Sequence, residues 1–167
     1  MAGGPTETIP VASLRLLRRL RPAVKGLYRF ARHADDLTDE GSAPPAQRAL
    51  ALRALHAQLD AIERAAPSAW PDLAAAVRTY RLPLLPLRDL LSAFEQDLHM
   101  TRYANYASLL DYCRRSANPI GRLLRALFGC PQPALVAWSD AICPGLQLIR
   151  QDIALDYCRW PGVPAAR

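Results

Sequence analysis

The chain has 167 residues, 51% of them hydrophobic, and a formal net charge of +6. This is enough for one domain with a buried core. We find no run of about 18 apolar residues and no signal-peptide pattern, so we expect a cytoplasmic protein without a transmembrane helix. All but one of the 21 basic residues are arginine, whose planar fork suits phosphate groups, although a biased composition explains the charge equally well.

Helical signals follow one another along the chain, because Ala, Leu and Arg dominate and strand-like alternation is nearly absent. Caps, prolines and glycines set the expected limits. The predicted helices cover about 13–20, 22–41, 45–65, 71–80, 86–99, 105–129 and 133–157. Ser13 and Asn105 are the expected N-caps, and Gly41 is the expected stop. Pro119 lies inside the sixth segment and predicts a kink or break near Asn118.

One predicted helix carries an unusual acidic face. Tyr28, Arg32, Asp35 and Asp39 are spaced so that they share one side of the helix, next to an apolar side that must pack inward. The carboxylates repel one another and lie near the negative end of the helix dipole, a cost that a bound cation would offset. Oxygen ligands at this spacing suit Mg²⁺, but a solvated acidic helix end is the alternative.

A second acidic pair with the same spacing, Asp152 and Asp156, lies near the end of the chain. If the two helices face each other, four carboxylates surround one pocket for Mg²⁺ and a diphosphate. The four cysteines have no neighbours at zinc-ligand spacing, so we interpret them as buried thiols. Nucleic acid is not an expected partner, because no basic stretch is interleaved with aromatic residues.

Three segments together are similar to the squalene/phytoene synthase family. They are PVASLRLLRRLRPAVKGLYRFARHADDLTDEG, FEQDLHMTRYANYASLLDYCRRSANPIGRLLRALFG and SDAICPGLQLIRQDIALDY, which lie between about residues 7 and 157. The SANPIG stretch resembles the bacterial hopanoid-pathway squalene or hydroxysqualene synthase branch. The resemblance implies an all-α isoprenoid synthase-type helical bundle with a central cavity, and farnesyl or presqualene diphosphate as substrate.

The resemblance also implies roles for individual residues. Asp35 and Asp39 match the first aspartate-rich motif, and Asp152 and Asp156 match the second; both bind the substrate's diphosphate through Mg²⁺. Substrate-binding positions match Tyr28, Arg32 and Gln147, and Tyr112 matches a tyrosine that lines the cavity near the reacting carbons. For Asn118 we expect a role in the step that admits water, with a helix-kink residue before Pro119 as the alternative.

The sequence departs from the family pattern at the second motif. Ile149 and Arg150 alone separate Leu148 from Gln151, so two residues, including a metal-associated Asn, are missing relative to the family. A deletion of two residues rotates the following helix by about 200°. Members of the family continue into further helices after this motif, whereas this sequence stops soon after it. We therefore expect residues 1–167 to form a single partial domain without those C-terminal helices, with an atypical tail at 158–167.

Several readings of the function follow. The first is a Mg²⁺-dependent prenyl transferase; the second is an inactive fragment or a helical subunit that needs a partner, with exposed apolar faces and a tendency to associate. A helical metal-dependent phosphohydrolase is the third, but His33, His56 and His99 are not arranged as metal ligands. Besides the isoprenyl diphosphate, the expected partners are the inner-membrane surface and other synthases of the pathway.

Overall fold

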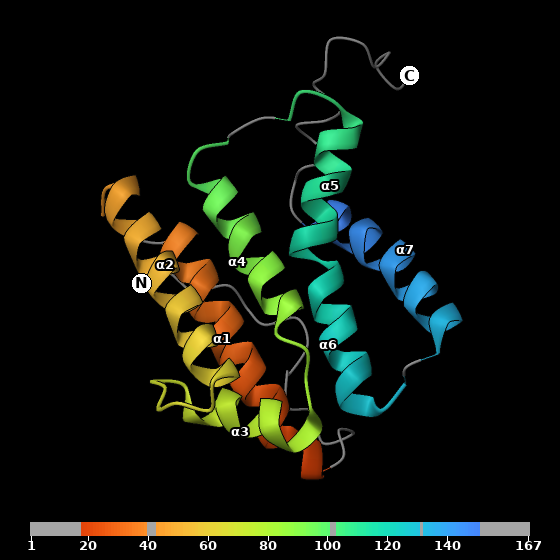
Figure 1. The fold of residues 1–167 in the computed structure, drawn as a ribbon. Coiled ribbons are helices and arrows are strands. Elements are labelled where there is room, and N and C mark those ends of the chain that lie inside the picture. The colour runs from red at the N-terminus through yellow and green to blue at the C-terminus, as the bar shows by residue number, and fades with distance from the viewer. Residues whose placement is uncertain (1–17, 40–42, 101–102, 131, 151–167) are drawn as a thin grey trace, which may run out of the picture.

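A computed structural model describes residues 18–39, 43–100, 103–130 and 132–150, without the side chains of Asp39 and of residues 148–150. All regular structure in these ranges is helical (Figure 1). The elements are a 3₁₀ turn η1 (Arg18–Leu20) and the α-helices α1 (Arg21–Asp39), α2 (Pro45–Glu63), α3 (Pro71–Tyr80), α4 (Leu85–Asp97), α5 (Tyr106–Ser116), α6 (Asn118–Phe128) and α7 (Pro133–Arg150).

The observed helices confirm the expected all-α class and most of its boundaries. Proline within the first turn begins α2, α3 and α4, where its missing N–H costs nothing. Helix α3 has the predicted limits, while α2 and α4 each end two residues before the expected position. The Ser13 cap, the Gly41 stop and the extension of the last helix to Tyr157 lie outside the described residues.

The predicted interruption near Asn118 is where one helix ends and the next begins. Asn105 caps α5 as predicted: its side chain accepts from the Ser108 backbone N–H at 2.9 Å, and the Ser108 hydroxyl accepts from the Asn105 N–H at 3.2 Å. Ala117 then joins α5 to α6, and Pro119 occupies the first turn of α6. The two helices form an almost continuous column (Figure 1).

The main core lies between α1, α2, α3 and α4. Phe30 and Ala34 of α1 are fully buried and Leu27 nearly so, as the predicted apolar face requires. Gly26 sits where α1 approaches α3 most closely, since a Cβ there would lie 3.1 Å from the Asp72 carbonyl carbon. A small second cluster, comprising Ala93, Leu109, Tyr112 and Cys113, joins α4 to α5.

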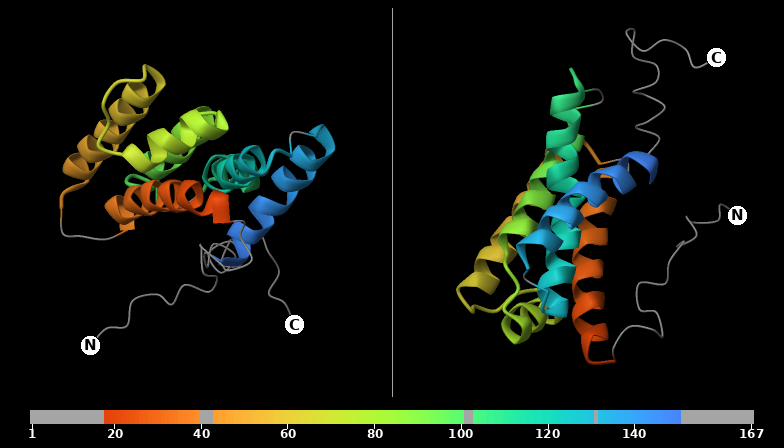
Figure 2. Two further views of the ribbon diagram at one scale, coloured as in Figure 1. Left: turned by 90° about the horizontal axis from the view of Figure 1, so that it is seen from below. Right: turned by 90° about the vertical axis from the view of Figure 1, so that its right-hand side faces the viewer.

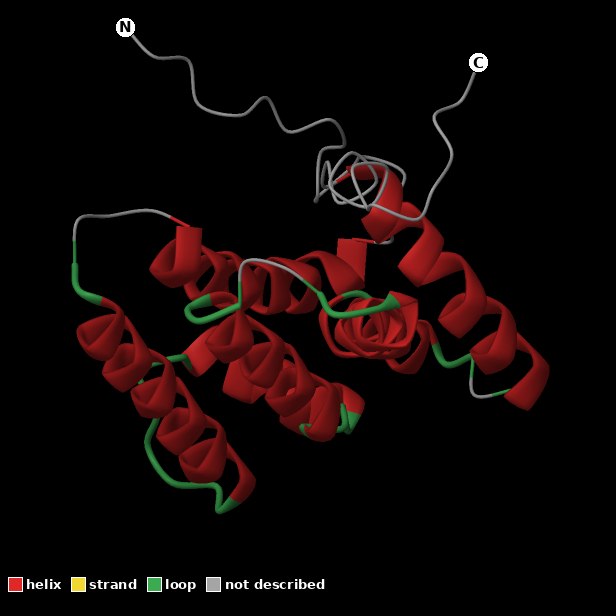
Figure 3. Cartoon of the chain, turned by 90° about the horizontal axis from the view of Figure 1, so that it is seen from above, coloured by secondary structure: helices red, strands yellow, loops and turns green. Residues whose placement is uncertain are grey.

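Helices α2 and α7 occupy opposite edges of the molecule, and α7 crosses the α5–α6 column obliquely on its outer side (Figures 2 and 3). Arg122 of α6 forms a bidentate ion pair with Asp140 of α7, in which Nη2 lies 2.7 Å from Oδ2. Gly121 lets α7 come close, because a Cβ there would lie 2.4 Å from Ser139 Oγ. No helix in the described part of the chain is long and apolar enough to cross a membrane.

The prediction that the cysteines are buried thiols is right for Cys113 and wrong for two others. Cys113 is fully buried, and burial raises the pKa of its thiol. Cys130 and Cys143 are partly exposed, because Cys130 follows the end of α6 in a turn and Cys143 lies on α7 at the margin of its contact with Gly121. Cys158 lies outside the described residues.

Candidate functional site

The acidic face of α1 forms a compact charged cluster. Arg32 Nη1 donates to Asp35 Oδ2 at 3.0 Å, and Arg32 Nη2 lies 2.8 Å from Asp36 Oδ1. The side chains of Arg32, Asp35 and Asp36 are each about one-third exposed, which places them at the edge of the core as expected. Arg32 thus offsets part of the carboxylate repulsion that we expected a cation to relieve.

Asp36 is a member of this cluster that the sequence interpretation missed. Its Oδ1 is buried and pairs with Arg32 by charge, without hydrogen-bond geometry. A carboxylate oxygen at the core edge with an unused lone pair is a group that a metal ion or a donor can still engage. The sequence contained a signal for this pair, because Asp36 lies four residues after Arg32 and side chains at that interval meet on a helix.

An arginine of the next helix caps the C-terminal end of α1. Arg48 of α2 donates from Nη1 to the Thr38 carbonyl oxygen at 2.6 Å, and the Thr38 hydroxyl donates to the Asp35 carbonyl at 2.7 Å. A positive group at a helix C-terminus opposes the negative end of the dipole. The end of α1 is therefore held in place although it carries several carboxylates.

The remaining predicted members of this site are described in part. Tyr28 lies half-buried one turn before Arg32 on α1, and Gln147 lies half-buried on α7. The backbone of Asp39 ends α1, but its side chain lies outside the description, as do Asp152 and Asp156 altogether. The facing of the two aspartate pairs therefore stays a prediction.

Tyr112 lies in a separate, buried position on α5. It is 3% exposed, its hydroxyl donates to Asp97 Oδ2 of α4 at 2.8 Å, and its ring centroid is 5.3 Å from that of Tyr103. Burial, followed by the charge of Asp97, raises the pKa values of both tyrosines far above the ordinary range. Both phenols are therefore neutral donors at physiological pH, and Asp97 orients the one on Tyr112.

Asn118, at the start of α6, is 2% exposed, and its Oδ1 has no hydrogen-bond partner among the described residues. The hydroxyl oxygen of Ser116, two residues earlier, is also buried without a hydrogen-bond partner among the described residues. An unpaired buried amide oxygen costs about 1–3 kcal/mol unless a water or ligand satisfies it. Its position before Pro119 agrees with the helix-break interpretation, and its role in admitting water stays a prediction.

Within the described residues, a metal ion at α1 would find few protein ligands. The described residues contain no group of three or more His, Cys, Asp or Glu side chains that could hold a metal ion. Mg²⁺, however, often uses one or two carboxylates together with substrate phosphates and waters. Asp35 is the one predicted metal ligand whose side chain is described, and Asp36 Oδ1 adds a second carboxylate oxygen in the same cluster.

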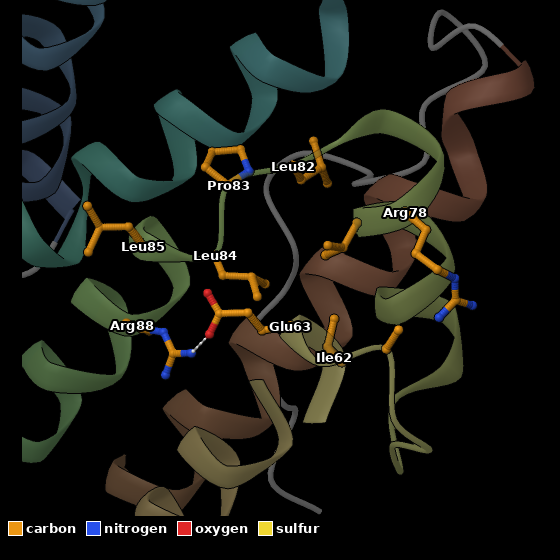
Figure 4. A pocket seen from close by; sticks show the side chains of 10 residues that line it. Ile62, Glu63, Arg78, Leu82, Pro83, Leu84, Leu85 and Arg88 are labelled. Carbon is orange, nitrogen blue, oxygen red and sulfur yellow. Dashed lines mark hydrogen bonds and ion pairs between the residues drawn. The ribbon is translucent and has the colours of Figure 1, made fainter. Parts of the chain in front are cut away.

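A surface hollow of about 560 Å³ lies elsewhere (Figure 4). It is lined by the end of α2, by α3 and by the start of α4, and Arg88 at its wall is bound to Asp60 and Glu63. Because α2 starts near the acidic end of α1 and the hollow is at the far end of α2, about 25 Å separates the two places. None of the predicted site residues lines this hollow.

The arrangement of helices defines the class of protein: it is the all-helical isoprenoid synthase fold. The squalene synthase HpnC from Alicyclobacillus acidocaldarius superposes with a TM-score of 0.75 at 36% identity, over 87% of this chain and 57% of that one. Residues 4–159 match the family model for squalene/phytoene synthase. The chain belongs to the squalene/phytoene synthase family.

The curated relatives agree with this assignment. A hydroxysqualene synthase from Zymomonas mobilis is 35% identical over 93% of this chain and 53% of its own length. A presqualene diphosphate synthase from Rhodopseudomonas palustris is 31% identical, over 87% of this chain and 53% of its own length. The chain therefore spans about half the length of the curated relatives that it matches.

Proposed function

We propose that the chain binds an isoprenyl diphosphate along α1 and belongs to a squalene or hydroxysqualene synthase that acts on farnesyl or presqualene diphosphate. The observation that carries this proposal is the cluster in which Arg32 holds Asp35 and Asp36 at the edge of the core. The names of the relatives from Zymomonas and Rhodopseudomonas support the substrate class. In this proposal the chain contributes to isoprenoid and hopanoid biosynthesis as a transferase.

The chemistry needs positive charge at the head of the substrate. When the carbon–oxygen bond of an allylic diphosphate breaks, the leaving group gains negative charge and the isoprenoid becomes a carbocation. Bound Mg²⁺ would neutralise that leaving group. The residues proposed to hold Mg²⁺ are Asp35 and Asp39 on α1, with Asp152 and Asp156 on the second motif.

Arg32 has a double task in this proposal. Without substrate its fork neutralises the two carboxylates, which keeps the acidic end of α1 helical. A cation on Asp35 competes with Arg32 for that carboxylate, so part of the guanidinium group becomes available to a phosphate oxygen. Tyr28, one turn away on the same face, is the second proposed contact of the diphosphate.

Tyr112 and Asn118 are proposed to act at the other end of the substrate. Tyr112 is neutral and fixed by Asp97, so it presents an aromatic ring and no base to a carbocation. Asn118 has the unused amide oxygen that could position a water molecule. Gln147 on α7 is the proposed contact from the second motif.

The test is incubation of the full chain with labelled farnesyl and presqualene diphosphates and Mg²⁺, with bound substrate and products identified by mass spectrometry. The informative variant is Asp35→Asn, which keeps the shape and removes the charge. Asp72→Asn is the matched control, because Asp72 forms an exposed ion pair with Arg29 away from the cluster. We expect Mg²⁺-dependent binding that falls at least tenfold in Asp35→Asn and is unchanged in Asp72→Asn.

The two competing interpretations differ in turnover. Product formation supports a complete enzyme, whereas binding without product supports a chain that needs a partner to complete its site. Absence of Mg²⁺-dependent binding by a chain with an intact helical circular dichroism spectrum rejects the proposed function. Asn118→Gly tests the water step: in an active enzyme it should lower the share of alcohol, which forms when water captures the carbocation and a proton is lost, relative to the hydrocarbon that forms when the carbocation itself loses a proton.

We also propose that the protein works in the cytoplasm at the inner surface of the membrane, near other synthases of its pathway. The net charge of +6 favours an anionic lipid surface, and the isoprenoid products are apolar. Sedimentation with vesicles should show more binding to anionic than to neutral lipid, and less at high salt. Equal binding to both lipid types would contradict this placement.

A further inference from the structure

The last turn of α1 carries the proposed metal ligands Asp35 and Asp39, although general helix rules make this turn unstable. The last four carbonyl groups of an α-helix have no partner within the helix. Carboxylates at this end are destabilised by the helix dipole and by one another. No basic residue lies in the last turn of α1 to oppose them. The sequence of α1 alone therefore does not explain how the two ligands would keep a fixed separation.

Two consecutive hydrogen bonds hold this turn. Arg48 of α2 donates from Nη1 to the Thr38 carbonyl oxygen at 2.6 Å, and the Thr38 hydroxyl donates to the Asp35 carbonyl oxygen at 2.7 Å. The Thr38 carbonyl belongs to the peptide group that joins Thr38 to Asp39. The first bond therefore holds the backbone next to one proposed ligand, and the second holds the backbone of the other.

The surroundings of these bonds make them effective. Thr38 is only 9% exposed, so water competes little for its carbonyl and hydroxyl groups. Leu52, one turn after Arg48 on α2, is fully buried in the core that α2 shares with α1, which fixes the helix that carries the arginine. The Nε of Arg48 is buried without a hydrogen-bond partner among the described residues. Because an unused buried donor is unfavourable, the bond to Thr38 is the contact that explains an arginine here.

We propose that Arg48 is a positioning residue of the metal site on α1, which acts through the backbone of Thr38 and sets the affinity for Mg²⁺ in the presence of the diphosphate. The proposal rests on the proposed function of this site. Mg²⁺ requires nearly ideal octahedral geometry, so its ligands must be held in place. If loss of Arg48 left the last turn of α1 ordered in a tenth of the molecules, the apparent affinity would fall tenfold.

A role through charge alone would have the opposite effect. Arg48 brings a positive charge to the turn that carries the carboxylates, and a positive charge weakens their attraction for a cation. Removing an arginine that acted only by its charge would therefore strengthen the binding of Mg²⁺. Removing an arginine that orders the turn would weaken it, so the two roles predict changes of opposite sign.

The first test measures the Mg²⁺ concentration that gives half-maximal binding of farnesyl diphosphate to the full chain. Arg48→Met removes the donor and the charge but keeps an apolar stem, and should raise this concentration at least tenfold. Arg88→Met is the matched control, because Arg88 of α4 also binds α2, through ion pairs with Asp60 and Glu63. It should leave the requirement for Mg²⁺ unchanged.

Two further variants separate the hydrogen bonds from the charge. Thr38→Val keeps the shape and charge of the turn but removes the donor to the Asp35 carbonyl, and should raise the half-maximal Mg²⁺ concentration severalfold. Arg48→Lys keeps a donor and should bind Mg²⁺ more tightly than Arg48→Met. Amide hydrogen exchange at residues 36–39 reports the order of the turn without any ligand. It should be faster in Arg48→Met and Thr38→Val than in the unaltered chain or in Arg88→Met.

The outcomes distinguish this proposal from the proposed function. An unchanged or lower Mg²⁺ requirement in Arg48→Met, an equal rise in Arg88→Met, or unchanged hydrogen exchange overturns the positioning role and leaves the proposed function intact. If the unaltered chain shows no Mg²⁺-dependent binding, the proposed function is rejected and this proposal with it. Should Arg48→Met lose its helical circular dichroism spectrum, the same criteria apply to Thr38→Val.

Discussion

Individual residues in this chain are positioned by partners on other helices. Asp97 accepts from Tyr112 across fifteen positions of sequence, and Arg48 closes the end of α1 from the next helix. No spacing rule links such pairs, so the sequence could not indicate them. Arg32, Asp35 and Asp36 are different, because intervals of three and four residues bring them together on one helix.

The buried tyrosines make stability dependent on alkaline pH. The pKa values of Tyr103 and Tyr112 are raised, first by burial and then by the charge of Asp97. The folded chain therefore holds these protons more tightly than the unfolded chain, whose tyrosines ionise near pH 10. This contribution is fully present below about pH 10 and is lost as the pH rises further.

We expect the free energy of unfolding to fall above about pH 10. The exposed tyrosines should ionise in the folded chain, whereas Tyr103 and Tyr112 should contribute tyrosinate absorbance only after unfolding. Urea titrations at increasing pH, with absorbance followed in parallel, provide the measurement. In Tyr112→Phe the pH dependence should become shallower. Complete ionisation of all six tyrosines in the folded chain would contradict the burial described here.

At the scale of elements, the local signals predicted most of the helices. Proline in first turns, the Asn105 cap and the Pro119 break place the limits of five helices within about two residues. Local rules failed at two of the cysteines, because the exposure of a side chain depends on packing between helices. The second aspartate pair lies outside the described residues, so the direction in which its carboxylates face remains a prediction.

The cap of α5 can be tested directly. Asn105→Ala removes an acceptor for the Ser108 N–H and should lower the free energy of unfolding by about 1 kcal/mol, measured by urea denaturation. Asn105→Asp retains a capping oxygen and serves as the control. If the alanine and aspartate variants were equally stable, the capping box would contribute nothing.

Two glycines with opposite surroundings provide a second test. Gly26→Ala pushes a methyl group against the backbone of Asp72 and Leu73, and should cost about 1–2 kcal/mol in spite of its better helix propensity. Gly145→Ala meets no atom of the described residues within 4 Å and should stabilise the chain by about 0.5–1 kcal/mol. Thermal or urea unfolding of both variants checks the expected opposite signs, and effects of the same sign would contradict this account.

At the scale of the whole molecule, the proposed first aspartate pair lies on a well-packed helix, and the chain covers about half the length of its curated relatives. Among the described residues, the core around α1 is formed with α2, α3 and α4. We therefore expect substrate binding at the proposed first pair to be measurable separately from turnover.

The most direct measurement is the affinity of the full chain for farnesyl diphosphate, with Mg²⁺ and after its removal by a chelator. We predict binding that requires Mg²⁺, falls at least tenfold in Asp35→Asn, and persists in Asp72→Asn. Binding that is equal with and without the metal, or unchanged in Asp35→Asn, would contradict the role assigned to α1.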